Sequence, residues 1–332
     1  MYAYGALSDR VIVVTRERLS HCAQTTDWLA VERLTDTQVT CLGASPERPE
    51  QVFVGTDESG IQRSRDGGKT FERVSDITDR ITALSVSPHN PNEIWAGTEP
   101  SAVYQSDDGG DSWQACAPLL ELDTADRWSF PPRPQTHHVR WLAHHPEQDE
   151  TVYVAIEAGA FVKTTDGGDS WVDHPEGARL DNHTLATHPN VPDRVYTAAG
   201  DGYAESDDAG RTWTYPQDGL EHTYVWGLAV GPENPETVVV SAADGARRAH
   251  RTETAESYIY RWVGDGWTVS MDGLPQPEGT TRSVLAAGSI PGELLALNNH
   301  GLFRTLDGAR SWRELPIEFE GDAVARGLVV VG

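Results

Sequence analysis

An eight-residue motif that occurs five times constrains the fold of this chain more than any other feature. The copies share the pattern Ser/Thr-x-Asp-x-Gly-x-Ser/Thr-aromatic, with Ala309 in place of the glycine in the last one. They are SRDGGKTF (64–71), SDDGGDSW (106–113), TTDGGDSW (164–171), SDDAGRTW (206–213) and TLDGARSW (305–312), and we call these segments the boxes. A repeat of about 42 residues, seen where no insertion intervenes, indicates a repeat protein.

The residue types of the boxes predict a tight turn between two strands. Asp and Ser/Thr side chains accept hydrogen bonds from backbone N–H groups a few residues further on, glycine supplies a positive φ, and the aromatic side chain is buried under the turn. Turn chemistry accounts for every position of the motif, so we interpret its aspartates as structural and not catalytic. They are Asp66, Asp108, Asp166, Asp208 and Asp307.

A second pattern comes before the boxes and defines the rest of each repeat. It consists of a short apolar strand, a turn that contains proline, and a second strand, as in ITALSVSPHNPNEIWAGT (81–98). With the two strands that flank a box, each repeat has four strands, which is typical of a propeller blade. Six repeats are explicit, and a seventh is divided between about residues 10–34 and residues 324–332.

The sequence therefore predicts an all-β protein, a seven-bladed β-propeller of four-stranded antiparallel blades. We expect one domain over residues 1–332. The N-terminal strands and the C-terminal strand together would close the ring, which leaves no open sheet edge.

The boxes resemble those of the BNR/Asp-box family (bacterial neuraminidase repeats). The pairing of DGGxSW boxes with proline-rich turns is most similar to the sialidase-like and photosystem II assembly-factor-like "glycosyl hydrolase BNR repeat" propellers. The resemblance covers essentially the whole chain and implies a propeller fold. Because that family includes glycoside hydrolases, receptors and non-enzymatic assembly factors, it leaves the activity open.

The charge balance excludes some classes of partner. The chain has 51 acidic and 26 basic residues, for a net charge of −25. Such a surface repels phosphates, so we expect neither nucleic acid nor a membrane as partner. The charge is spread along a lysine-poor chain, which resembles proteins of halophilic archaea. No long apolar run and no leader pattern is present, and we expect a cytoplasmic monomer.

Two insertions point to the face of the propeller where a site is expected. They span residues 119–138 and 244–258, and both fall on the face formed by the connections between blades and between the second and third strands. Long loops in a compact fold are usually functional or disordered. We expect the first to be an ordered lid and the second to be more mobile.

Arginine, histidine and tryptophan gather at the predicted start of several innermost strands on that face. In so acidic a protein these residues suit an anionic ligand held by guanidinium groups, with an aromatic ring to stack on. The alternative is a set of solvated charges that pair with one another. The candidate ligand-binding residues are His138, Arg140, His183, Trp226, Arg282 and Arg326.

Catalytic chemistry is less well supported by the sequence. A glycosidase needs two carboxylates across a cleft, and Glu99 and Glu157 on neighbouring blades are the best placed. His137–His138 and His144–His145 lack further ligands at a fixed spacing, so no metal site and no cofactor is expected. We favour a non-catalytic binding or assembly scaffold for a protein partner or a carbohydrate or other anionic ligand. A sialidase-like glycoside hydrolase is the alternative.

Overall fold

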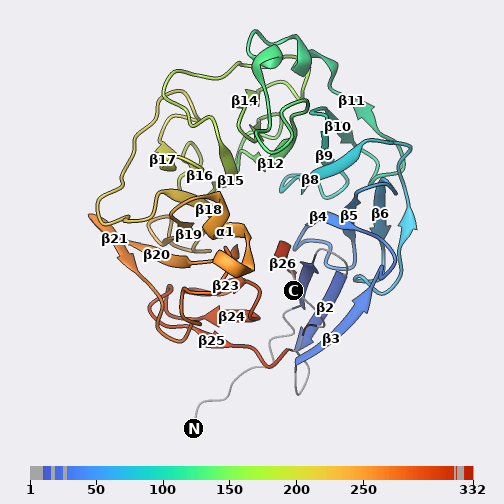
Figure 1. The fold of residues 1–332 in the computed structure, drawn as a ribbon. Helices are drawn as coiled ribbons and strands as arrows, with labels where there is room; N and C mark the ends of the chain where they lie inside the picture. The colour runs from blue at the N-terminus through green and yellow to red at the C-terminus, as the bar shows by residue number, and fades with distance from the viewer. Residues whose placement is uncertain (1–9, 16–18, 25–27, 318, 320–324, 332) are drawn as a thin grey trace.

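The protein is a β-propeller. The computed structural model describes residues 10–15, 19–24, 28–317, 319 and 325–331. Small antiparallel sheets stand as blades around a central axis, and each begins with its innermost strand (Figure 1). The innermost strands contact one another in the order β4, β8, β12, β15, β18, β22 and β26, and β26 contacts β4. The ring is therefore closed.

Six blades follow one another between Val39 and Glu314, and four of them have four strands. The first consists of β4 (Val39–Ala44), β5 (Val52–Thr56), β6 (Ile61–Ser64) and β7 (Glu72–Arg73). The second consists of β8 (Arg80–Val86), β9 (Ile94–Glu99), β10 (Val103–Ser106) and β11 (Gln114–Ala115). The fifth consists of β18 (Tyr224–Val230), β19 (Val238–Ala243), β20 (Ser257–Val263) and β21 (Gly266–Val269). The sixth consists of β22 (Val284–Ala287), β23 (Leu294–Leu297), β24 (Leu302–Thr305) and β25 (Arg313–Glu314).

The third and fourth blades have only three strands. The third consists of β12 (Val139–His144), β13 (Val152–Ile156) and β14 (Ala160–Thr164). The fourth consists of β15 (Asn182–Thr187), β16 (Val195–Ala199) and β17 (Gly202–Ser206). The prediction of a seven-bladed propeller with four strands in each blade is therefore wrong, because Val39–Glu314 holds six blades of four or three strands. In the two short blades the outermost strand is reduced to single bridges, Lys163 with Val172 and Glu205 with Thr214.

The loss of the fourth strand has a local cause. In complete blades the residue three positions after the aromatic residue of the box donates its backbone N–H to the third strand, as Val74 does to Ile61 O and Leu315 to Leu302 O. Pro216 stands at this position in the fourth blade and has no N–H to donate. In the third blade the N–H of His174 bonds the side chain of Asp173 instead, at 2.7 Å.

One further sheet lies between the sixth and first blades. Its order is β26 (Ala325–Val331), β1 (Arg10–Thr15), β2 (Leu19–Gln24) and β3 (Trp28–Arg33). The C-terminal strand pairs antiparallel with β1, with Arg10 opposite Val331. The sequence predicted this pairing of the N-terminal and C-terminal strands. The predicted seventh repeat, residues 10–34 and 324–332, falls partly outside the described residues. The positions outside are 16–18, 25–27, 324 and 332.

Close approach of neighbouring blades builds the core. The second strand of most blades is buried along its whole length, as in β5, β13 and β16. A Cβ atom at Gly97 would lie 2.3 Å from Val139 Cγ1 of the next blade, so only glycine fits there. The blades are packed face to face with no space for a larger side chain at that contact.

Each box folds into the same hydrogen-bonded turn. In the second blade Asp108 Oδ1 accepts hydrogen bonds from the backbone N–H of Ser112 and from the hydroxyl of Ser106, both at 2.9 Å. Asp108 Oδ2 accepts from the hydroxyl of Ser112 at 2.6 Å, and these bonds lower the pKa of Asp108 to about 2. The same pattern recurs at Asp66, Asp166, Asp208 and Asp307.

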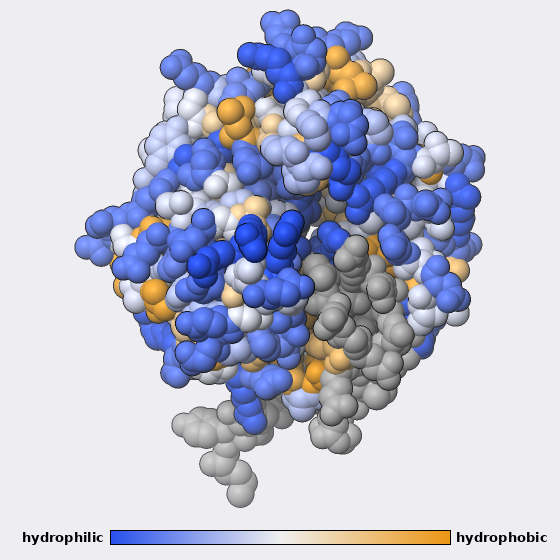
Figure 2. Space-filling model, in the orientation of Figure 1, coloured by the Kyte–Doolittle hydropathy of each residue, from blue (hydrophilic) through white to orange (hydrophobic). Residues whose placement is uncertain are grey.

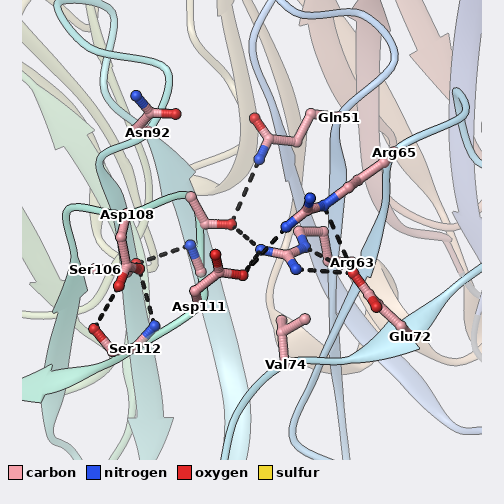
Figure 3. A network of polar contacts seen from close by, with 12 residues as sticks. Gln51, Arg63, Arg65, Glu72, Val74, Asn92, Ser106, Asp108, Asp111 and Ser112 are labelled. Atoms are coloured by element: carbon pink, nitrogen blue, oxygen red, sulfur yellow. Dashed lines mark hydrogen bonds and ion pairs between the residues drawn. The ribbon is translucent and has the colours of Figure 1, made fainter.

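The boxes also connect neighbouring blades. Arg63 of β6 donates to Gly109 O in the box of the next blade and pairs with Asp111 at 2.7 Å and with Glu72 at 2.8 Å (Figure 3). Lys163 donates to Ala209 O at 2.7 Å in the corresponding place, and the hydroxyl of Ser270 donates to Ala309 O. The boxes therefore stabilise both a turn and a contact between blades.

We expect the substitution Asp108→Ala to lower the free energy of unfolding by about 1–3 kcal/mol, because it leaves the hydroxyl and N–H donors of the turn without their acceptor. Urea unfolding followed by circular dichroism measures the change. Asp107→Ala is the matched control, because Asp107 is an exposed neighbour in the same box. Equal stability of the two variants would contradict a structural role for the box aspartates.

Candidate functional site

A β-bulge on the innermost strands places the candidate residues. The register between the first two strands of five blades skips one residue at the same position. Bulges re-aim a side chain and are common next to functional sites. The skipped residues are Thr40, Thr82, Arg140, His183 and Trp226, and Arg326 is skipped where β26 pairs with β1.

Some bulge side chains form hydrogen bonds to the next blade, and others do not. The hydroxyl of Thr40 donates to Ile81 O of the next blade, and that of Thr82 donates to Val139 O at 2.7 Å. His183 makes the corresponding bond from Nδ1 to Val225 O, also at 2.7 Å. The bulge side chains Arg140 and Trp226 instead contact each other, and we call the place where they meet the mouth.

Trp226 lies at the centre of the mouth. The guanidinium carbons of Arg140 and Arg282 lie 4.6 and 4.3 Å from the centre of its ring. The imidazoles of His183 and His250 lie 4.3 and 4.4 Å from it. Arginine stacks well on aromatic rings because its guanidinium is planar and weakly hydrated. The indole therefore holds two positive charges close together, which repel each other.

Glu157 is the carboxylate of this cluster. The backbone N–H of Glu157 donates to His138 O, which aligns the two side chains. Glu157 Oε2 lies 2.9 Å from His138 Nε2 and 3.3 Å from Arg140 Nε. Burial alone would raise the pKa of Glu157, but the hydrogen bond of His138 and the charges of His183, His138 and Arg140 lower it to about 2. Glu157 is therefore ionised at neutral pH.

Arg282 is a buried charge without a carboxylate. Its side chain donates to His250 Nδ1 at 3.2 Å and to Ala325 O at 3.0 Å, both neutral acceptors, and the residue is 4% exposed. Within the described residues no carboxylate pairs with it. Burial, together with the charges of Arg140 and Arg326, lowers the pKa of Arg282 well below its ordinary value. An unpaired buried charge destabilises the folded protein, so an anion that binds beside Arg282 would be stabilising.

Two other groups, His250 and Tyr224, complete the hydrogen bonding of the mouth. Because Arg282 donates to His250 Nδ1, the proton of the neutral imidazole is on Nε2, which lies 3.1 Å from Tyr224 Oη. Burial and Arg282 lower the pKa of His250 to about 2. Burial and the charge of Glu157 raise the pKa of Tyr224. The phenol of Tyr224 thus accepts from His250 and keeps its own proton for a ligand.

Both insertions contain short helical segments. The insertion over residues 119–138 contains the end of η1 (Ala117–Glu121) and η2 (Ala125–Arg127), and its Trp128 is buried. The insertion over residues 244–258 contains α1 (Ala246–His250) and η3 (Thr252–Thr254). Figure 2 shows strongly hydrophilic residues over α1, beside the centre of the ring. This short helix brings His250 to Trp226.

The structure brings together all six predicted ligand-binding residues and Glu157, but it gives Glu99 another role. Glu99 pairs with Arg80 at 3.3 Å and with Arg133 of the first insertion at 2.7 Å. It therefore anchors the insertion to the second blade. A glycosidase with Glu99 and Glu157 as its acid and base would need one raised pKa, and Glu157 has a lowered one.

Sequence reasoning missed two residues of the mouth, Asp181 and His250. Asp181 Oδ1 lies 3.6 Å from His183 Nε2 and accepts the N–H of Ala158 at 3.0 Å. Its position just before an innermost strand, where other blades have Arg or His, was the available signal. His250 reaches the mouth only through the fold of α1, so the strand pattern contained no sign of it.

A hydrogen-bonded tyrosine–glutamate pair, Tyr203 and Glu205, lies outside the mouth. Tyr203 donates to Glu205 Oε2 at 2.7 Å on β17, the third strand of its blade. Burial raises the pKa of Tyr203 well above its ordinary value. This pair does not supply the nucleophile that a sialidase-like mechanism needs.

Comparison with solved structures supports the fold. A GH74 enzyme of Niastella koreensis is similar with a TM-score of 0.67 and 17% identity, over 93% of this chain and 54% of that one. YCF48 bound to a D1 peptide is similar with a TM-score of 0.59 and 16% identity, over 99% and 97%. YCF48 from Cyanidioschyzon merolae has a TM-score of 0.60 and 12% identity, over 98% of both chains.

These likenesses define the class of protein and nothing finer, because identities this low show the fold alone. The chain is a β-propeller, and it spans about half the length of the GH74 enzyme. No family model and no curated protein matches it. Within the described residues, none of the helices is long and apolar enough to cross a membrane.

We expect Glu157→Gln to lower the free energy of unfolding by about 3–5 kcal/mol at pH 7, because it removes the buried carboxylate that pairs with Arg140 and bonds His138. Thermal and urea unfolding in buffer with a chelator measure this change. Glu58→Gln, at an exposed position in the first blade, is the control.

The difference in free energy of unfolding between the wild type and Glu157→Gln should depend on pH. The pKa of Glu157 is lower in the folded protein than its ordinary value of 4.5. Its contribution to stability is therefore complete above about pH 4.5 and is lost as the pH falls towards 2. A difference between wild type and Glu157→Gln that stays constant from pH 7 to pH 3 would contradict this assignment.

Proposed function

We propose that this protein is a non-catalytic scaffold whose mouth binds a carboxylate of a protein partner. Arg282 is the observation that carries the proposal, because it is buried, positively charged and bonded only to neutral acceptors. A ligand carboxylate there would gain a charge-assisted bidentate bond. Tyr224 could add a hydrogen-bond donor, and Arg140 a second cation.

Two further observations support a protein partner. The insertions over residues 119–138 and 244–258 place short helical segments on the face of the mouth, against which a peptide can lie. One structure of similar fold, YCF48, has been solved with a D1 peptide. A peptide presents carboxylates at acidic side chains and at its C-terminus, so it offers the chemistry that the arginines need.

The proposal predicts opposite effects of one substitution on stability and on binding. Arg282→Met removes a buried charge that has no counter-charge, so the free energy of unfolding of the ligand-free protein should stay the same or rise. Binding of a carboxylate should weaken by at least tenfold. A display library of peptides with free C-termini selects the probe, and fluorescence anisotropy measures its affinity for both proteins.

Two controls make the result specific. Arg310→Met changes an exposed arginine in a box, at the other end of the blade, and should leave the affinity unchanged. Amidation of the peptide C-terminus, or replacement of its acidic residues by amides, should weaken binding to the same degree as Arg282→Met. Undiminished binding by Arg282→Met would contradict the proposal, as would a large loss of stability in that variant.

A glycoside hydrolase is the second candidate, and one observation favours it. Carboxylate oxygens of Glu157 and Asp181 lie within 4.8 Å of each other, near the separation of about 5–5.5 Å between the carboxyl groups of retaining glycosidases. The GH74 likeness is compatible with this reading. Against it, Glu157 is ionised, and its pKa does not suit a general acid.

We expect no hydrolysis of a panel of polysaccharides and aryl glycosides above the level of a buffer blank, because the lowered pKa of Glu157 does not suit a general acid. Reducing-sugar and chromophore release measure this at high salt and in low-salt buffer. Hydrolysis that Glu157→Gln and Asp181→Asn abolish, and that Asp201→Asn does not, would overturn the scaffold in favour of an enzyme.

A further inference from the structure

The ring of His183 is held with one nitrogen satisfied and the other without a hydrogen bond. His183 Nδ1 lies 2.7 Å from Val225 O, and a carbonyl can only accept, so Nδ1 carries a proton. In the neutral imidazole Nε2 then has a lone pair. Nε2 is buried and has no hydrogen-bond partner, and the residue is fully buried. An imidazole fixed by a carbonyl at one nitrogen is typical of metal ligands.

Two carboxylates face that nitrogen. Asp181 Oδ1 lies 3.6 Å from His183 Nε2, and the ligand atoms of Glu157, Asp181 and His183 all lie within 4.8 Å of one another. A neutral lone pair and a carboxylate oxygen repel each other, so the arrangement needs a positive charge between them. A proton on Nε2 or a bound cation supplies it.

We propose that Glu157, Asp181 and His183 form a binding site for a divalent transition-metal ion such as Zn²⁺. An imidazole with two carboxylates suits first-row transition metals better than Mg²⁺ or Ca²⁺. Zn–N and Zn–O bonds are about 2.0–2.2 Å, so the three ligands would close in by on the order of 1 Å. Asp181, whose side chain is 36% exposed, is the ligand with room to move.

The surroundings of these ligands support a metal site. His138 and Arg140 both contact Glu157 through Oε2, which leaves Oε1 for the ion and orients the carboxylate. The N–H of Ala158 orients Asp181 in the same way. Outer-shell bonds of this kind fix ligand geometry. Three protein ligands leave a coordination position open, beside Trp226 and the arginines.

Titration with Co²⁺ tests the site with metal alone. The chelator-treated protein, dialysed into buffer of high ionic strength, should bind one Co²⁺ per chain, with visible absorption bands of a four- or five-coordinate ion. Elemental analysis after desalting gives the stoichiometry. Zn²⁺ should displace Co²⁺ and raise the melting temperature, because a ligand of the folded state stabilises it.

Two variants and a control decide the outcome. Asp181→Asn retains an oxygen for the bond from Ala158 and should weaken Co²⁺ binding at least tenfold, and His183→Gln should abolish the absorption bands. Asp201→Asn removes one exposed negative charge nearby and should change neither. This control matters because an acidic surface attracts cations without a specific site.

The proposal fails if the wild type binds no stoichiometric Co²⁺, or if all three variants behave like the wild type. In that case the positive charge between His183 and Asp181 is a proton, and the two side chains form an ion pair. The test uses no peptide and no polysaccharide. Absence of metal binding would therefore not contradict the proposed carboxylate-binding function. Peptide binding by the metal-free protein would likewise not contradict the metal site.

Discussion

The β-bulge at the start of the innermost strands is the constraint on which the mouth depends. A regular strand alternates its side chains between its two faces, and in a propeller both faces are packed against neighbouring blades. One extra residue breaks this alternation and frees a side chain from the packing. At Thr40 and Thr82 the freed side chain links two blades, and at Arg140 and Trp226 it reaches the mouth. The same backbone irregularity thus links blades on one side of the ring and forms the mouth on the other.

The fold separates these two tasks along each blade. The bulge lies near the start of the first strand. The end of the first strand, Ala44, is opposite Val52, the start of the second strand. Val52 is in turn opposite Ser64, the end of the third strand, where the box begins. Boxes and bulges therefore lie at opposite ends of the strands. The contacts of the boxes are therefore separate from those of the mouth, where the unpaired charge of Arg282 lies.

Sequence alone predicted what depends on local chemistry. The Asp and Ser side chains of the box at Asp108 bond with one another and with its backbone, so this turn could be inferred from its own eight residues. Aligned innermost strands identified Arg140, His183 and Trp226. The strand count failed at Pro216 and at Asp173–His174, where a missing or diverted N–H ends the ladder. Asp181 and His250 were missed because their partners come from other segments, and spacing along the chain does not encode such contacts.

Closure of the ring through β26 and β1 has a consequence for how the molecule assembles. The six blades form from strands adjacent in the chain, whereas the further sheet pairs Arg10 with Val331, which are far apart in the chain. Loop-closure entropy makes such a contact slow to form, and contacts of this range lower folding rates. The mouth contains Arg326 of β26 beside Arg282. Its full set of arginines therefore comes together only when the last strand docks, so the mouth is a property of the completed ring and not of any partly folded arc.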